Sequence, residues 1–429
     1  MTVVFIRRRA AMCIAALGLT LVASACGSST PTAVSSSSAA AGASSPAGST
    51  PVSSSAGVGA ASTDASAGSS ATPGTVEIVI SEANGCVATP DSVPAGAITF
   101  HVVNQDAAGV TEVELVSEER IRGERENLAP GFEDTFSVKL DGGSYEIYCP
   151  GASTERMAFT VTGEAAQTPT DVADLLQQAS VDYADYVDLQ TGLLVDAVKP
   201  LVAAIKAGDL EAARTAYAQA RRPYERVEPV AESFGDLDPA IDARAGDVPE
   251  SEWTGFHPIE QALFEKKTTK GLDELADKLQ ADVADLQARA KELGENTRND
   301  ADKDRYQPDE VANGAVALLG EVQASKITGE EERYSHIDLL DFAANVEGSQ
   351  QAFAALKPAL NQIDPTVVPS IDKQFDALTT QLDTYKDPSA LGGYVLYVDL
   401  DKSDTKKLTD GLLAVIEPLS DVSAKIANA

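Results

Sequence analysis

The chain has 429 residues and a formal net charge of -33, because 66 aspartates and glutamates outnumber 33 lysines and arginines. A surface this acidic repels nucleic acids and anionic lipids and attracts cations, so we expect no nucleic-acid partner. The length leaves room for two or three folded domains.

Residues 1–26 have the pattern of a bacterial lipoprotein signal. Residues 7–9 are arginines and precede an apolar run over residues 10–22, as in a secretory signal. This run is too short to span a bilayer comfortably. It leads into the sequence LVASAC, and small residues before a cysteine are typical of a signal whose cysteine is lipidated. We predict that Cys26 anchors the protein to the outer face of the cytoplasmic membrane; the alternative is ordinary cleavage beside an incidental cysteine.

Residues 27–74 consist almost wholly of serine, alanine, glycine, threonine and proline. Such a segment cannot bury enough apolar surface to offset the entropy lost on ordering. We therefore predict a disordered tether between the anchor and the folded domains.

Residues 75–163 contain short runs of alternating apolar and polar residues, separated by turn-forming residues, which predicts a small all-β sandwich. The sequences VPAGAITFHVVNQ and LAPGFEDTFSVKLDGGSYEIYC resemble strands of a cupredoxin, and Met157 follows Cys149 at the spacing of blue-copper proteins. A blue-copper site also needs two histidines. Thr111 and Ala152 stand in their places, so we do not expect an ordinary blue-copper centre.

Two interpretations of Cys86 and Cys149 stay open. A disulfide is the default for paired cysteines outside the cytoplasm. Alternatively, both cysteines join a carboxylate, Glu112, as ligands of an altered metal site. Glu114 shares a strand face with Glu112, because side chains two residues apart point the same way. His101 falls within a predicted strand, where we interpret it as structural.

Residues 168–429 carry apolar residues at the three- and four-residue spacing of helices, and β-type runs are scarce. Gly208 is predicted to end one helix and Asp209 to cap the next. This pattern predicts an all-α domain built as one or two antiparallel bundles.

The segment SEWTGFHPIEQALF carries His257 and Glu260 three residues apart, so a helix that begins near Pro258 would place both on one side. An imidazole and a carboxylate at this spacing form half of a metal site in helical bundles, although the same pair also occurs on surfaces and at helix ends.

Other helical segments supply further candidate ligands for this metal site. We predict that Glu228 joins the pair from the preceding acidic segment. Glu331 and His336, in the segment EEERYSH, are additional candidates from the opposite half of the domain. Carboxylates with an imidazole suit iron, manganese or zinc better than cuprous copper.

Three segments closely resemble the imelysin-like domain of the EfeO family: YERVEPVAESFGDLDPAID, EWTGFHPIEQALF and KITGEEERYSHIDLLDFAANVEG. The resemblance extends over residues 75–429, because that family joins a cupredoxin-like domain to the helical one. Pro258 departs from it, since a basic residue is expected there. The resemblance implies an extracytoplasmic component of an EfeUOB-type iron uptake system, which delivers iron to a membrane permease. It further implies a haem peroxidase as a possible partner and copper or zinc as alternative metals.

A zinc-dependent peptidase of the imelysin type is the alternative function. Zinc hydrolases commonly use the pattern His-Glu-x-x-His, with the glutamate as general base. That pattern is absent from the chain, so we expect metal binding without catalysis. A carbohydrate-binding or adhesion module is disfavoured, because aromatic residues make up only 5% of the chain.

Overall fold

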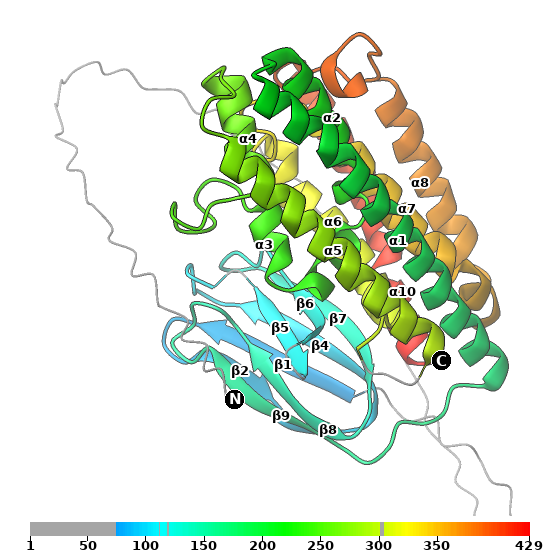
Figure 1. Ribbon diagram of the computed structural model, residues 1–429. Coiled ribbons are helices and arrows are strands. Elements are labelled where there is room, and N and C mark those ends of the chain that lie inside the picture. The colour runs from blue at the N-terminus through cyan, green and yellow to red at the C-terminus, as the bar shows by residue number, and fades with distance from the viewer. Residues whose placement is uncertain (1–73, 111, 118–119, 301–303) are drawn as a thin grey trace, which may run out of the picture. The chain divides into compact units, whose positions relative to one another are not determined.

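The computed structural model in Figure 1 describes residues 74–110, 112–117, 120–300 and 304–429. The predicted signal, the predicted lipidation site Cys26 and nearly all of the predicted tether lie outside the described residues. Within them, no helix combines the length and the apolar character that a membrane span requires.

Two mixed sheets make up the described part of the N-terminal region. One has the strand order β2-β1-β4-β7, with β1 parallel to β4; the other has the order β3-β9-β8-β5-β6, with β3 parallel to β9. The prediction of an all-β region is therefore confirmed. The strands are β1 (Gly74–Ser81), β2 (Gly85–Thr89), β3 (Ser92–Pro94), β4 (Gly96–Asn104), β5 (Val113–Ser117), β6 (Arg120–Arg125), β7 (Glu133–Leu140), β8 (Gly143–Tyr148) and β9 (Arg156–Thr162).

Alternating apolar side chains form the core between these sheets. Strand β4 buries Ile98, Phe100 and Val102, while the residues between them are only partly covered. Phe100 stacks on Phe136 of its own sheet, with ring centroids 4.9 Å apart. It also meets the edge of Phe159 from the other sheet at 5.4 Å, so aromatic contacts join the two layers.

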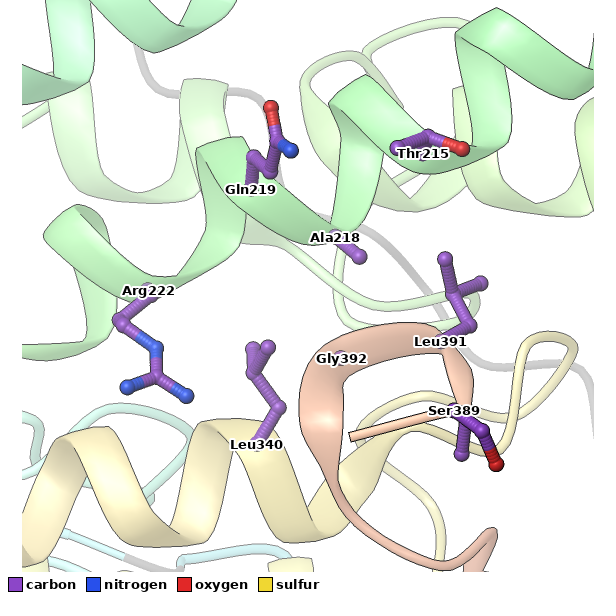
Figure 2. A pocket seen from close by; sticks show the side chains of 9 residues that line it. Thr215, Ala218, Gln219, Arg222, Leu340, Ser389, Leu391 and Gly392 are labelled. Carbon is purple, nitrogen blue, oxygen red and sulfur yellow. The ribbon is translucent and has the colours of Figure 1, made fainter. Parts of the chain in front are cut away.

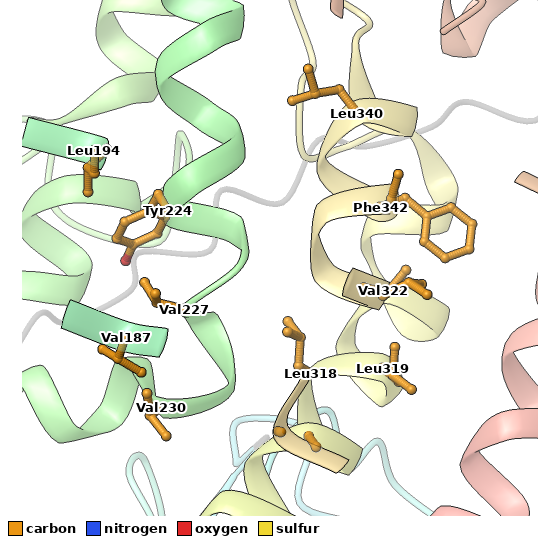
Figure 3. Packing of buried hydrophobic residues seen from close by; sticks show 14 of the residues in the cluster. Val187, Leu194, Tyr224, Val227, Val230, Leu318, Leu319, Val322, Leu340 and Phe342 are labelled. Carbon is orange, nitrogen blue, oxygen red and sulfur yellow. The ribbon is translucent and has the colours of Figure 1, made fainter. Parts of the chain in front are cut away.

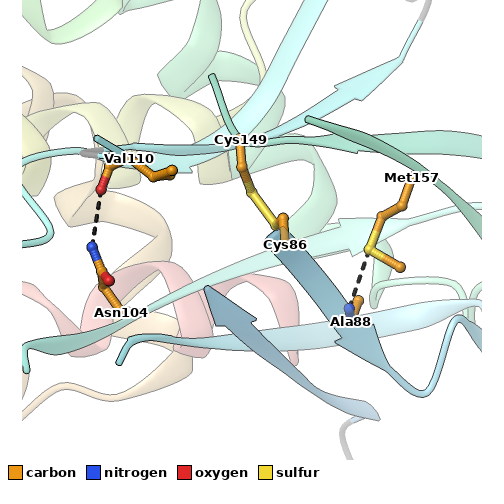
Figure 4. The surroundings of a disulfide bond; sticks show 6 residues. All are labelled: Cys86, Ala88, Asn104, Val110, Cys149 and Met157. Carbon is orange, nitrogen blue, oxygen red and sulfur yellow. Dashed lines mark hydrogen bonds between the residues drawn. A yellow bond between two sulfur atoms is a disulfide. The ribbon is translucent and has the colours of Figure 1, made fainter. Parts of the chain in front are cut away.

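A disulfide between Cys86 and Cys149 also joins the two sheets (Figure 4). This is the first of the two interpretations given above. The sulfur of Met157 lies 3.1 Å from the backbone nitrogen of Ala88, which is in β2 together with Cys86. Glu112, the third candidate in this region, is partly buried, and burial raises its pKa. A metal-ligand role for the two cysteines would require reduced thiols and stays a prediction.

We predict that Cys149→Ser lowers the free energy of unfolding by about 2–5 kcal/mol, because a disulfide restricts the unfolded chain. Denaturant unfolding measures this loss, and Cys86→Ser should give the same value within error. Thiol labelling of the unfolded, unreduced wild-type chain should modify neither cysteine. Labelling of both would show that the disulfide does not form.

Helices begin at Thr170 and continue to Ala427, which confirms the predicted all-α region. They are α1 (Thr170–Ala207), α2 (Leu210–Glu225), α3 (Leu237–Asp242), α4 (Phe256–Glu260), α5 (Asp273–Asn299), α6 (Pro308–Ala324), α7 (Asp338–Ile363), α8 (Val367–Asp383), α9 (Lys402–Leu419) and α10 (Asp421–Ala427), with short 3-10 or π turns η1 (Glu228–Phe234), η2 (Gln261–Glu265), η3 (Lys326–Thr328), η4 (Leu391–Gly393) and η5 (Tyr397–Asp399).

The long helix α1 packs against α2, α5 and α7 (Figure 1). It ends where predicted: Gly208 adopts a left-handed conformation with φ of 76°. The Asp209 side chain then accepts a hydrogen bond from the backbone of Ala212 at 3.1 Å and caps α2. Both boundary predictions are confirmed.

A continuous apolar core supports the helices (Figure 3). Val187 and Leu194 of α1 contribute to it together with Tyr224 near the end of α2. Leu319 of α6 and Phe342 of α7 belong to the same cluster. This core holds α2, α6 and α7 at fixed positions, and these three helices lead into or carry the charged residues described next.

Polar contacts connect strand β6 with the start of α6. Arg122 lies 2.6 Å from Glu310, and Arg120 lies 2.8 Å from the same carboxylate.

The change from strands to helices falls between Thr162 and Thr170, where the sequence predicted it. The division into domains at 75–163 and 168–429 stays a prediction about independent folding units.

Candidate metal centre

A close approach between α3 and α4 places His257. Gly255, just before α4, has a φ of +85°, and a Cβ there would lie 2.0 Å from the carbonyl oxygen of Ile241. Only glycine fits such a position without strain. The turn directs His257 and Glu260 inward, where they are 2% and 0% exposed, with Nδ1 3.2 Å from Oε2. The prediction that they share one side is confirmed, and a surface pair is excluded.

The other imidazole nitrogen of His257 faces two carboxylates. Its Nε2 lies 3.5 Å from Oδ1 of Asp242 and 3.6 Å from Oε1 of Glu331. The three potential ligand atoms lie within 4.8 Å of one another. They come from α4, from the end of α3 and from the segment between η3 and α7, so the fold assembles this group from distant parts of the chain.

A second ligand group shares Asp242 with the first. Glu225, at the end of α2, and Glu228, at the start of η1, each offer an oxygen within 4.8 Å of the others in the group. Lys326 reaches the same carboxylates and lies 2.7 Å from Glu228. The Asn345 side chain donates to Glu225 at 2.9 Å and also to Glu228.

The Arg221 guanidinium lies between these carboxylates and is fully buried. It lies 2.9 Å from Glu331 and 2.9 Å from Glu332. It also pairs with Glu225, one helical turn away, and with Asp242. One side chain therefore connects α2 and α3 with the segment that precedes α7.

The buried charges around Arg221 do not balance. Three basic side chains are at most 3% exposed: Arg221, His257 and Lys326. Six carboxylates are equally buried: Glu225, Glu260, Glu331, Glu332, Asp338 and Asp341. Buried like charges of this kind favour either proton uptake or a bound cation. Burial raises the pKa values of Glu332 and Asp341 well above their usual range, so proton uptake offsets part of this excess negative charge, and a bound cation would offset the rest.

The pKa values of the first ligand group reflect its surroundings. Burial alone would lower the pKa of His257, but the hydrogen bond to Glu260 and the nearby carboxylates of Glu331 and Asp242 raise it to about 10. Burial raises the pKa of Asp242 to about 7, although Arg221 and His257 act against this rise. Despite burial, Lys326 and His257 hold the pKa of Glu331 well below its usual value. A metal ion must therefore displace the imidazole proton.

The contacts of Glu260 join the imidazole to the segment before α7, and its role as a metal ligand stays a prediction. Its Oε1 accepts hydrogen bonds from the backbone nitrogens of Tyr334 and Ser335 at 2.7 and 2.8 Å, and its Oε2 faces the imidazole. Glu260 thus orients His257 and fixes the segment that carries Glu331. It is not a member of either ligand group.

The other predicted site residues lie in different parts of the structure. Glu331 lies in the first ligand group and Glu228 in the second. His336 has a left-handed backbone with φ of 61°, is half-buried, and belongs to neither group among the described residues. Cys86, Cys149 and Glu112 belong to the β region and to neither group.

Sequence reasoning did not select Asp242, Arg221 or Lys326 as site residues. For Arg221 a signal existed: it lies four residues after Tyr217 and four before Glu225, on the face that α2 buries. A charged residue on an apolar helix face needs a buried partner. For Asp242 the decisive contact depends on the turn at Gly255, which the spacing of charged residues does not reveal.

A pocket of about 640 Å³ is lined by residues of α2, the start of α7 and the segment around η4 (Figure 2). Arg222 and Gln219 of α2, Leu340 of α7 and Gly392 of η4 line part of it. Arg222 follows the buried Arg221 in the chain, so one of two adjacent arginines lines the pocket and the other belongs to the charged group. None of the residues of the two ligand groups lines this pocket.

Comparison with known proteins gives consistent matches. The family profile of imelysin matches residues 179–422, a range that contains both ligand groups. The iron uptake system component EfeO of Escherichia coli O157:H7 is 37% identical over 353 residues, which cover 81% of this chain and 90% of that protein. The chain belongs to the EfeO family. The EfeO protein of Escherichia coli strain UTI89 is 38% identical over 337 residues, which cover 77% of this chain and 86% of the relative.

Membership of the EfeO family confirms the resemblance seen in the three sequence segments. The EfeO proteins named above are components of an iron uptake system. A solved chain from Parabacteroides distasonis covers 61% of this chain and 97% of its own length, at 17% identity and a TM-score of 0.45. A likeness at this level supports no conclusion about function, so the assignment depends on the sequence relatives.

Proposed function

We propose that this EfeO-family protein binds iron outside the cytoplasm and passes it to a membrane permease of an EfeUOB-type uptake system. A haem peroxidase of the same system is a further proposed partner. The named function of the EfeO relatives and the buried acidic group in the imelysin domain both support this proposal. Iron is the cargo in this proposal, and copper and zinc remain alternatives.

The observation that carries the proposal is the group formed by His257, Asp242 and Glu331. Its one imidazole nitrogen and two carboxylate oxygens come within 4.8 Å of one another, and Nε2 of His257 is buried without a hydrogen-bond partner. A mixed nitrogen and oxygen ligand set of this kind suits iron, manganese and zinc. Glu225 and Glu228 extend the set through the shared residue Asp242.

The N-terminal sheets are proposed to be a cupredoxin-like domain. The motifs around Cys149 and the two-sheet arrangement support this. An altered metal site of Cys86, Cys149 and Glu112 would form only when the disulfide is reduced. Any redox role of this domain in iron uptake is proposed on the family resemblance alone.

The peptidase alternative receives less support from the geometry. A general base must reach a water molecule beside the substrate. Both oxygens of Glu260 already have partners, and the side chain is fully buried. These contacts favour a binding role over hydrolysis. Proteolysis that is lost in Glu260→Gln would instead support the peptidase.

Lipid anchoring at Cys26 is proposed from the sequence LVASAC. Cys26→Ser should convert a membrane-associated protein into a released one, because the thioether that carries the lipid cannot form. Fractionation of cells followed by detection of the protein measures this change. A variant that stays with the membranes after a high-salt wash would contradict the anchor.

The ligand assignment predicts the effect of His257→Ala and Asp242→Asn. Each should lower iron affinity by at least about 100-fold. Loss of a residue that only orients a ligand typically costs about 10–100-fold, and loss of a ligand itself should cost no less. Glu260→Gln should cost about 10–100-fold, because it disturbs the imidazole orientation. Anaerobic titration calorimetry with ferrous iron measures the affinities, and circular dichroism verifies the helical fold.

Matched controls are available on the same chain. His101→Ala removes a histidine that pairs with Glu77 in the β region, and Asp277→Asn removes an exposed carboxylate that pairs with Lys206. Neither should change iron affinity. If His257→Ala and Asp242→Asn bind iron as tightly as the wild type, the proposed site is wrong.

The raised pKa of His257 predicts that metal binding releases protons. With a pKa of about 10, the imidazole is protonated at neutral pH, and a metal ion can bind its nitrogen only after that proton leaves. Affinity should therefore rise by about tenfold per pH unit between pH 7 and pH 10, and more steeply below pH 7, where Asp242 is also protonated. Calorimetry with zinc in buffers of different ionisation enthalpy counts the released protons. A wild-type count of zero would refute this prediction, and His257→Ala should release about one proton fewer.

A further inference from the structure

Lys326 is a buried cation within the proposed binding site. It begins the short helix η3, and its side chain is 2% exposed. Its ammonium lies 2.7 and 2.9 Å from the two oxygens of Glu228 and 3.2 Å from Glu225. It also lies 3.8 Å from Oε1 of Glu331, the oxygen that faces His257.

The carboxylates that surround this ammonium are also proposed metal ligands. Glu225 and Glu228 form the second ligand group with Asp242, and Glu331 belongs to the first. A carboxylate oxygen that coordinates a metal ion holds a nearby ammonium less strongly, because the two positive charges repel each other. Lys326 and a metal ion would therefore compete for this site.

Lys326 and Arg221 differ in how readily each side chain can leave its carboxylate partners. The planar Arg221 guanidinium contacts carboxylates from several elements and is fully buried. Lys326 has a compact ammonium on a flexible stem, and its main partner Glu228 has a side chain that is 10% exposed. Lys326 pairs with three carboxylates and Arg221 with five, so the lysine has fewer contacts to lose when it moves.

Asn345 provides an independent indication that this position can accept another cation. Its amide nitrogen donates to Glu225 and Glu228, while its Oδ1 is buried without a hydrogen-bond partner. A buried oxygen without a partner is costly. Rotation of the amide would exchange its nitrogen for an oxygen beside these carboxylates, and oxygen is a ligand type that hard cations accept.

We propose that Lys326 is a tethered competitor of the metal cargo, which must be displaced from Glu225 and Glu228 when the metal binds and returns when the metal leaves. This inference depends on the proposed function. It explains how a site with many carboxylates avoids holding its cargo too tightly to release it. Lys326 also lies five residues before Glu331 and 3.8 Å from its Oε1, so its displacement would change the charge beside the first ligand group.

The test compares Lys326→Met with the wild type by anaerobic titration with ferrous iron and by titration with zinc. Removal of the competitor should raise affinity by about 5–150-fold, the usual range for coupling between two ligands of one protein. Lys278→Met is the matched control, because it removes an exposed lysine that pairs with Asp282 outside the site. The control should bind both metals as the wild type does.

A second measurement uses the wild-type protein and does not depend on the folding of the variant. Acetic anhydride labelling followed by mass spectrometry reports the reactivity of Lys326 before and after saturation with zinc. Displacement should make Lys326 react faster in the zinc-saturated protein, while Lys278 should react at the same rate in both. An unchanged or slower rate at Lys326 overturns the inference.

The outcomes separate this inference from the proposed function. If the wild type binds neither metal, or if His257→Ala binds as tightly as the wild type, the proposed function fails. If His257→Ala weakens binding but folded Lys326→Met binds no more tightly than the wild type, only the competitor role fails. Tighter binding by Lys326→Met together with faster labelling of wild-type Lys326 supports it.

Discussion

The arrangement of the helical region depends on the pairing of one buried guanidinium with several carboxylates. Arg221 connects α2 with Asp242 of α3, with Glu331 of the segment before α7 and with Asp341 of α7, which lies 120 residues further along the chain. Removal of one partner from such a buried network commonly costs about 3–5 kcal/mol, because the remaining charges lose their compensation. The same network stays acidic overall. The side chains that hold these elements together are thus the same ones that carry the excess of carboxylates.

A chain of hydrogen bonds links the imidazole to the segment that supplies its neighbouring carboxylate. His257 contacts Glu260, and Glu260 accepts from the backbone of Tyr334 and Ser335. Glu331 lies only three residues before Tyr334 in the same segment. Glu260 thus connects His257 directly with the segment that carries Glu331, two parts of the first ligand group that lie far apart in the sequence.

Local pattern was sufficient to predict much of the fold. The change from strands to helices, the stop at Gly208 and the cap at Asp209 follow from side-chain periodicity and backbone preference, which act over a few residues. The shared side of His257 and Glu260 follows from helical spacing in the same way. The orientation of His336 could not be predicted in this way, because its left-handed backbone is not visible in the spacing of residues. The contacts of Asp242 and Lys326 could not be predicted either, because packing of distant segments brings their partners together.

The glycine before α4 determines how closely two segments meet. At Gly255 the backbone lies directly against the carbonyl of Ile241, the residue before Asp242, and His257 follows two positions later. The approach of the backbones that carry Asp242 and His257 is therefore limited by contact between main chains. The absence of a single methyl group at position 255 lets these two residues of the first ligand group come together.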